Sequence, residues 1–429
     1  MRDEFPTALY ELWCRLYSVI DNYQIQAASI SSSDLGLLTN RELSEAATNP
    51  AICQNLRLSK QPTSSELLQV LVCLRMFENM HRDLNYMRSR NSPTVAQLDG
   101  NRYLLVTPTK QNIYRAIKKE ERVTPFEDIG RLSTLGLKYD WLPLTLETEI
   151  DWSYDTALQD VREVLRIGIA PFANHKEMTW ECEEKPSPLD GSVPFFCADA
   201  EDQDALWSKI ESILEESLSN KVQILLLPEL VVTKLLLDRI RAWLYEKNED
   251  QIILLIVAGS RHVREEGGNE GHANRCTVLY GNGEVAWVQD KTQPFYLRQP
   301  HLQQMIPNCT YDNAREPALL GKRIAVRNTD IGRIVTPICL DYIARKTLWA
   351  DLKVDLYLVP AMSPRLDDFR ADAWKRGRNP SATMVCNAKI DGDLKHRIHD
   401  YIPQINHPTV YKTEKSVHLY MLDIDLKEE

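Results

Sequence analysis

Three side chains with complementary chemistry follow apolar segments in the second half of the sequence. Glu229 comes after the segment 224–228, Lys291 after 285–290, and Cys339 after 334–338. Segments of this length and composition predict β-strands. Open α/β sheets place their ligand sites at the carboxyl ends of strands, where residues distant in sequence meet. We therefore expect the three side chains to converge on one pocket.

Together these residues suit the hydrolysis of a carbon–nitrogen bond. A cysteine attacks as its thiolate, and Glu229 in a closed pocket could take the thiol proton. Attack on an amide or nitrile carbon builds negative charge, which the ammonium of Lys291 and the backbone amide of Leu340 would stabilise. Glu229 would then protonate the leaving nitrogen and activate the water that splits the thioester. Taken singly, each residue could instead be a loop carboxylate, a solvated lysine or a small core residue.

The elements that would position these residues alternate between strand and helix. Short apolar strands are expected at 165–170, 222–227, 252–258, 276–280, 284–288, 323–326, 332–338, 356–359, 383–386 and 417–422, and helices at 204–218, 234–243 and 367–375. A long loop rich in proline and glutamate is expected before the first of these helices. Continuous apolar strands interleaved with helices predict an α/β fold whose sheet is covered by helices on at least one face.

Residues 1–160 have a different texture. Apolar residues recur at helical spacing over 9–20, 67–77 and 111–121, which predicts a mainly α-helical N-terminal module, with a winged-helix-like core as one arrangement. A role in assembly, or in binding a protein partner, is favoured over DNA binding because the charges of this part balance. The predicted organisation is thus a helical module at 1–160 followed by an α/β domain at 161–429.

Composition excludes several classes of protein. The 429 residues are 43% hydrophobic and 26% charged, which is the mixture of a folded globular protein. The longest apolar run, 252–258, is far below the roughly 18–20 residues that cross a bilayer, and two acids near the amino terminus do not suit a secretory signal. A net charge of −10 disfavours a general nucleic-acid binder. We expect a cytoplasmic protein that acts on a small molecule.

Metals and cofactors are not expected. The nine cysteines include no C-x-x-C pair, so neither a disulfide framework nor a zinc ribbon is indicated. Glycine is scarce, with 16 residues, and no phosphate-cradling glycine loop occurs. His396 and His399 have metal-like spacing, but a histidine pair in a polar stretch is more often a solvated or substrate-adjacent surface, which is the interpretation favoured here.

Several short motifs resemble the nitrilase superfamily of carbon–nitrogen hydrolases. That family has a catalytic Glu, Lys and Cys in the order found in this chain. The matching strings are Leu227-Pro228-Glu229, Asp290-Lys291 and Ile338-Cys339-Leu340-Asp341, with connecting landmarks at Gly259-Ser260, Asn274, Gly281-Asn282-Gly283, Gly332, Pro360-Ala361 and Cys386-Asn387. The resemblance covers roughly residues 161–425.

The resemblance implies an αββα sandwich, a homodimer or higher homo-oligomer, and chemistry without a metal or cofactor. The implied catalytic residues are Glu229, Lys291 and Cys339. The resemblance does not carry over a substrate, and our hypothesis favours an amide or carbamoyl compound over a nitrile. Other residues predicted to line the pocket, with packing or an interface as the alternative, are Leu340, Tyr296, Arg298, Tyr342 and Met362.

The sequence also departs from the family. Many members carry a second glutamate shortly after the lysine, but no acid follows Lys291 until Asp312 and Glu316. His262, after the Gly-Ser strand, is predicted to be structural. The departures keep a second hypothesis open, in which the chain is a catalytically diverged binding or regulatory protein, for example in a bacterial defence system.

Overall fold

The computed structural model describes Thr63 and residues 94–98, 101–106 and 140–144, and then residues 149–426 except for 184–185, 187–189, 265–270, 317, 346–347, 350–351, 353, 364–365, 377–380, 389–398, 402–410 and 413–418. The chain divides into two compact units, and the larger contains Asp155–Glu429. Among the described residues, no helix combines the length and apolarity needed to span a bilayer.

One large sheet of the larger unit has seven strands. In sheet order they are β11 (Val285–Asp290), β10 (His272–Tyr280), β9 (Leu255–Arg264), β8 (Ile224–Leu226), β5 (Val164–Ile169), β20 (Tyr420–Asp425) and β19 (Tyr411–Lys412). β5, β8 and β9 are parallel, whereas β10 is antiparallel to both β9 and β11. β11 therefore points the same way as β8, so the ends that lead to Glu229 and Lys291 share one edge.

A second sheet has six strands. In order they are β18 (His399–Tyr401), β17 (Ala382–Asn387), β16 (Leu356–Ala361), β15 (Gly332–Val335), β14 (Arg323–Thr329) and β4 (Glu149–Tyr154). β15, β16 and β17 are parallel. The two sheets meet where the side chain of Gln289 on β11 accepts a 2.8 Å hydrogen bond from Ala325 N on β14.

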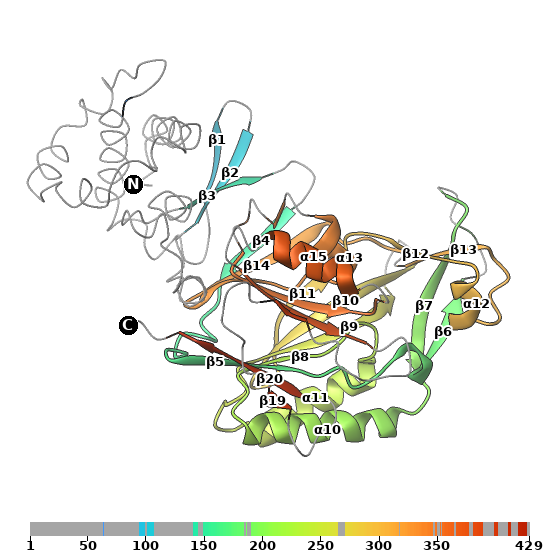
Figure 1. The fold of residues 1–429 in the computed structure, drawn as a ribbon, viewed down its shortest axis with the longest axis horizontal. Coiled ribbons are helices and arrows are strands. Elements are labelled where there is room, and N and C mark those ends of the chain that lie inside the picture. The colour runs from blue at the N-terminus through green and yellow to red at the C-terminus, as the bar shows by residue number, and fades with distance from the viewer. Residues whose placement is uncertain are drawn as a thin grey trace, which may run out of the picture. The chain divides into compact units, whose positions relative to one another are not determined.

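Helices cover the outer faces of both sheets (Figure 1). α10 (Gln203–Ser219) and α11 (Lys234–Lys247) begin at the side-chain caps of Asp202 and Thr233 and share a buried apolar core with the seven-stranded sheet. α13 (Leu340–Ala344) and α15 (Leu366–Arg376) pack on the six-stranded sheet, where Tyr342 contacts Tyr357 of β16 and Phe369 of α15. The larger unit is therefore an αββα sandwich, as the resemblance implied.

A four-stranded sheet includes two strands, β6 and β7, in sequence that was expected to be loop. Its strands, in order, are β12 (Phe295–Arg298), β13 (Asn313–Glu316), β7 (Val193–Ala200) and β6 (Met178–Cys182), and it is accompanied by the 3-10 turn at His175–Glu177 and by α12 (His301–Met305). The loop prediction for the region before 204 is wrong because its proline and glutamate gather between β6 and β7. The buried Val193 and Phe195 of β7 pack with Leu302 of α12 in a small separate core.

Apart from Thr63, the described part of residues 1–148 is β-structure. β1 (Thr94–Leu98), β2 (Asn101–Val106) and β3 (Asp140–Leu144) form a three-stranded antiparallel sheet. The predicted helices at 9–20, 67–77 and 111–121 lie outside the described residues. β4, although it precedes residue 161, belongs to the six-stranded sheet.

Candidate active site

Cys339 occupies a strained turn between β15 and α13. Its backbone has φ 47° and ψ −109°, a left-handed conformation that costs a non-glycine residue of order 1–3 kcal/mol. The turn is held by a 2.9 Å hydrogen bond from Cys339 N to Pro360 O at the end of β16. A sharp strand-to-helix turn of this kind projects a nucleophile from the end of a sheet and leaves the next backbone amide, that of Leu340, at the start of the helix.

Glu229 follows β8 and is fixed by close backbone packing. Gly259 of β9 passes so near that a Cβ at this position would lie 2.1 Å from Pro228 O, which explains the need for glycine. The hydroxyl of Ser260 accepts a 3.3 Å hydrogen bond from Leu230 N. The Oε2 of Glu229 accepts a 2.7 Å bond from Met362 N. The Gly-Ser pair and the segment after β16 thus position the carboxylate from two sides.

Lys291 lies between two buried carboxylates. Its Nζ is 2.9 Å from Glu229 Oε1 and 2.6 Å from Glu316 Oε2, and each of the three side chains is at most 2% exposed. Glu316 comes from the end of β13 in the four-stranded sheet. The second carboxylate expected of the resemblance is therefore present, and the prediction that it is missing is corrected. It reaches the lysine from a different sheet instead of from the residues directly after it.

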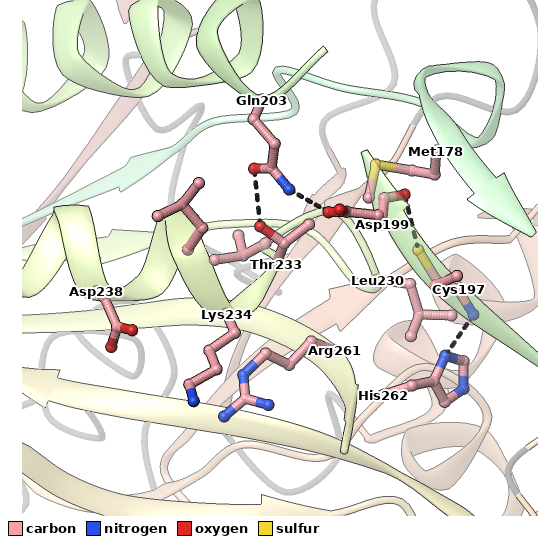
Figure 2. A pocket seen from close by; sticks show the side chains of 13 residues that line it. Met178, Cys197, Asp199, Gln203, Leu230, Thr233, Lys234, Asp238, Arg261 and His262 are labelled. Carbon is pink, nitrogen blue, oxygen red and sulfur yellow. Dashed lines mark hydrogen bonds between the residues drawn. The ribbon is translucent and has the colours of Figure 1, made fainter. Parts of the chain in front are cut away.

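Asn274 and His262 support the two carboxylates. Asn274 Nδ2 donates to Glu229 Oε1 at 3.0 Å and to Glu316 Oε1 at 2.7 Å. His262 Nε2 lies 3.2 Å from Glu316 Oε1, while its Nδ1 accepts a 2.8 Å hydrogen bond from Cys197 N (Figure 2). Because Nδ1 accepts, the ring proton is on Nε2, and His262 donates to Glu316. Residues 262 and 274 are cross-strand partners on β9 and β10, which places both side chains on the same face.

The surroundings of Glu229 and Glu316 shift the pKa values of the two carboxyl groups in opposite directions. For Glu316, burial opposes ionisation, but Lys291 and the hydrogen bond from His262 outweigh it and lower the pKa to about 2. For Glu229, burial dominates and the nearby charge of Glu316 adds to it, so that its pKa is raised despite Lys291. Environments that drive two carboxylates apart in this way assign a fixed anion and a proton carrier. Glu316 has the features of the fixed anion, and Glu229 has those of a group that could carry a proton.

The lysine and the thiol have correspondingly shifted proton affinities. Burial opposes the charge of Lys291, yet the two carboxylates raise its pKa well above the usual value, so the ammonium is retained. Burial and the adjacent Glu229 raise the pKa of Cys339 well above that of a free thiol. The resting nucleophile is therefore a thiol beside a carboxylate that can accept its proton.

Asp341, two residues after the nucleophile, joins the cysteine turn to the lysine loop. It is fully buried and accepts hydrogen bonds from Thr292 N at 3.0 and 3.1 Å and from Thr292 Oγ1 at 3.0 Å. Burial raises the pKa of Asp341 to about 7, and the bonds from Thr292 only partly oppose this. The short motif around Cys339 thus includes a residue that fixes the chain just after Lys291.

The other residues that were predicted to line the pocket lie in different surroundings, some beside the cluster and some away from it. Met362 contributes its backbone N–H to Glu229, and Leu340 is the first residue of α13. Tyr342 is buried and its hydroxyl pairs with Thr383 Oγ1 at 3.0 Å, in the layer between α13 and the six-stranded sheet. Tyr296 is 39% exposed on β12 and donates to Asp190 Oδ2 at 2.9 Å. Arg298 is exposed on the same strand.

A pocket of about 440 Å³ adjoins this cluster at His262 and at Leu230, the residue after Glu229. Its other walls come from β7 and from the first turns of α10 and α11 (Figure 2). Polar lining residues include Asp199, Gln203, Thr233, Lys234, Asp238 and Arg261. Neither Cys339 nor Lys291 lines it. The pocket therefore borders His262 and Leu230, next to the buried carboxylates, and is not lined by the Cys339 thiol.

Comparison with known proteins finds similarity only among solved structures, since no family model and no curated protein matches the sequence. Nit3 of Saccharomyces cerevisiae, described as a member of branch 10 of the nitrilase superfamily, is 13% identical with a TM-score of 0.39, over 64% of this chain and 93% of Nit3. NitFhit of C. elegans is 14% identical with a TM-score of 0.40, over 62% of this chain and 61% of its own. An amidase from Nesterenkonia sp. is 15% identical with a TM-score of 0.39, over 61% and 90%. At this level of identity, the chemistry of the chain must be argued from its own residues.

Proposed function

We propose that the chain is a thiol-dependent hydrolase of a non-peptide C–N bond, with an amide or carbamoyl compound as substrate. The observation that carries the proposal is the buried array in which Lys291 bonds both Glu229 and Glu316 next to the strained turn of Cys339. Burying three ionisable groups and straining a backbone cost stability, and such costs concentrate where a protein does chemistry.

The first step is attack by the thiol. Glu229 takes the proton of Cys339 as the sulfur adds to the substrate carbonyl carbon. The carbonyl oxygen becomes an oxyanion, and the ammonium of Lys291 with the backbone N–H of Leu340 stabilises it. Because Glu316 holds a permanent negative charge against Lys291, the ammonium stays protonated and fixed in place throughout.

The second step is loss of the nitrogen. Glu229, now protonated, donates to the departing amine, and the tetrahedral intermediate collapses to an acyl thioester on Cys339. A water then enters, gives a proton to Glu229 and attacks the thioester, which releases the acid and restores the thiol. The raised pKa of Glu229 suits both roles, because a general acid–base works best when its pKa approaches the operating pH.

The accessibility of the thiol supports a small substrate. Cys339 is 7% exposed and Met362 beside it is 9% exposed, so the nucleophile lies in a buried position. A polypeptide backbone would have to enter this buried position in extended form, whereas a small amide or carbamoyl group needs far less space. This favours non-peptide substrates.

The test combines turnover with capture of the intermediate. The full chain is incubated with a panel of small amides, carbamoyl compounds and nitriles, and ammonia release is measured while mass spectrometry follows the peptide that contains Cys339. We expect ammonia release with at least one compound and a mass increase equal to its acyl group on Cys339. Turnover that persists in Cys339→Ala would contradict the mechanism. An unmodified Cys339 and no ammonia across the panel would favour the diverged binding or regulatory protein.

A further inference from the structure

Two thiols outside the catalytic cluster lie in direct contact. Cys182 Sγ and Cys309 Sγ are 2.8 Å apart although 127 positions separate them in sequence. Cys182 is the last residue of β6, and Cys309 lies between α12 and β13. Both are recorded as free thiols. The fold therefore brings together two cysteines that share no sequence motif.

The two sulfurs would have to move only a short way to form a disulfide bond. A disulfide needs about 2.05 Å between sulfurs, so closing the gap requires a shift of less than about 1 Å. The other described cysteines have different surroundings. For example, Cys197 Sγ faces the carbonyl oxygen of Asp199 at 3.8 Å, and Cys276 and Cys386 are buried.

The surroundings of the pair allow a small oxidant to reach one sulfur and hold the other in place. Cys309 is 3% exposed and belongs to the apolar core formed by α12 and the four-stranded sheet, whereas Cys182 is only partly buried at its margin. Burial and the neighbouring Cys309 thiol raise the pKa of Cys182 to about 12, so the reactive thiolate is scarce near neutral pH and the pair stays reduced until peroxide is supplied in excess. Among the described residues, the pair bonds within itself and packs in the small core of α12 and the four-stranded sheet, not in the cluster of Cys339, Lys291 and Glu229.

We propose that Cys182 and Cys309 are a redox modification site that a peroxide converts into an intramolecular disulfide. One sulfur attacks a peroxide oxygen and becomes a sulfenic acid, with release of one water from hydrogen peroxide. The second thiol then displaces the hydroxyl group of the sulfenic acid, which leaves as the second water. Two thiols lose two electrons in total, and one hydrogen peroxide is reduced to two waters.

The disulfide would connect two parts of the unit that otherwise meet through apolar packing. It would join the end of β6 to the segment that enters β13, the strand that carries Glu316. A cross-link over so long a loop restricts the unfolded chain, and an increase in Tm of about 5–10 °C is expected. The proposal does not depend on the hydrolase function, because it concerns only the two thiols.

Peptide mapping tests the proposal directly. The full-length protein is reduced, freed of reductant, treated with hydrogen peroxide, alkylated in denaturant and digested without reduction. We expect a linked peptide pair containing Cys182 and Cys309, its loss in Cys182→Ser and in Cys309→Ala, and its retention in Cys197→Ser, the control on the adjacent strand β7. The Tm increase should accompany the link and reverse with reductant.

Two results would overturn the proposal. One is recovery of Cys182 and Cys309 as separate alkylated or over-oxidised peptides from folded, peroxide-treated protein. The other is a link that forms only when peroxide is added to protein already unfolded in guanidinium. Because mapping reads each cysteine separately, oxidation of Cys339 cannot imitate either outcome.

Discussion

Lys291 Nζ lies closer to Glu316 than to Glu229, at 2.6 Å against 2.9 Å. One cation is thus shared unequally by two buried carboxylates. The shorter contact, with the hydrogen bond from His262, keeps Glu316 ionised. Glu229 makes the longer contact with Lys291 and accepts a hydrogen bond from Met362 N. It is the carboxyl group whose pKa is raised. This inequality leaves Glu316 the more acidic of the two carboxyl groups and Glu229 the less acidic, as the proposed mechanism requires.

Replacing the nucleophile should abolish covalent chemistry and leave the fold intact. Cys339→Ala and Cys339→Ser are expected to lower turnover at least about 10³-fold, because no thioester can form. The acyl mass on the peptide should disappear. The Tm should not fall with Cys339→Ser, since the volume is kept. Cys197→Ser is the control for the loss of a thiol elsewhere. Retained turnover in either Cys339 variant would count against the mechanism.

Glu316→Gln should change the pH dependence as well as the rate. Without the negative charge of Glu316, the ammonium of Lys291 is held less firmly in place. We therefore expect kcat to fall about 10²- to 10³-fold, with a smaller change in KM. Removing the negative charge also removes a cause of the raised pKa of Glu229. The base should then ionise at lower pH, so the acidic limb of the kcat/KM profile should move to lower pH.

The direction of that shift separates electrostatics from structure. A variant that is merely misfolded would lose rate equally at every pH and would not move the limb. Glu316→Asp, which keeps the charge on a shorter side chain, should restore the position of the limb even where it restores only part of the rate. An acidic limb that moves upward in Glu316→Gln would contradict the assignment of roles.

His262 should act on the rate through Glu316. His262→Phe removes the donor to Glu316 and the acceptor for Cys197 N, and we expect kcat to fall about 10- to 100-fold, the value of a hydrogen bond to a charged group. His262→Gln, which can still donate, should recover part of the loss. A kcat unchanged in His262→Phe would show that the ring serves only the backbone of β7.

Asp341 should make stability depend on pH between about 4 and 7. Its pKa is raised to about 7 in the folded protein, so across this window the folded state holds a proton that the unfolded state has released. The free energy of unfolding should therefore decrease as pH rises, with this group contributing up to about 1.4 kcal/mol per pH unit, and level off above 7. Urea unfolding from pH 4 to 8 measures the slope.

Asp341→Asn should flatten that slope, because the site can no longer bind the proton. Glu149→Gln, at a side chain that is 68% exposed, is the matched control and should leave the slope unchanged. Equal slopes in the wild type and Asp341→Asn would mean that Asp341 is ionised throughout this range in the folded protein.

Gly259→Ala should be far more costly than Gly191→Ala. Both glycines have positive φ, at 61° and 70°, so an alanine pays about 1–2 kcal/mol for the backbone at either site. At Gly259 the new Cβ would also lie 2.1 Å from Pro228 O, whereas at Gly191 nothing lies within 4 Å. The additional loss of stability at Gly259 should exceed about 2 kcal/mol. Thermal unfolding of both variants gives the comparison, and equal losses would contradict the steric explanation.

Much of the site was predictable because it depends on strand ends. Glu229 and Lys291 follow β8 and β11, which run the same way in one sheet, so local pattern and the rule for open sheets placed these two side chains together. Cys339 follows β15 of the other sheet, so its approach to Glu229 depends on how the two sheets pack, which the pattern does not specify. Glu316 was not predictable in this way. It belongs to a four-residue strand whose position is set by pairing with β12 and β7, and nothing in the residues around it records that pairing.

The misplaced elements have similar causes. β6 and β7 pair across an irregular register and flank a stretch rich in proline and glutamate, so their alternation is short and interrupted. Tyr342 was expected at the pocket because it follows the nucleophile closely. Instead it is buried in the layer between α13 and the six-stranded sheet, where its hydroxyl pairs with Thr383 and its ring stacks on Phe369. Side-chain direction at this scale depends on helix phase, which a motif does not specify.

The segment from Pro360 to Met362 contributes to the site entirely through main-chain atoms. Pro360 O receives Cys339 N, Ala361 O receives Glu229 N at 3.4 Å, and Met362 N donates to the carboxylate. None of these three bonds uses a side chain of residues 360–362, whereas the side chains of Ala361 and Met362 are buried in the core. A mutational scan at 361 and 362 would therefore report how well each new side chain packs, and it would miss the part that the main chain plays in spacing Cys339 and Glu229. To change that spacing, an engineer would have to insert or delete a residue in this segment.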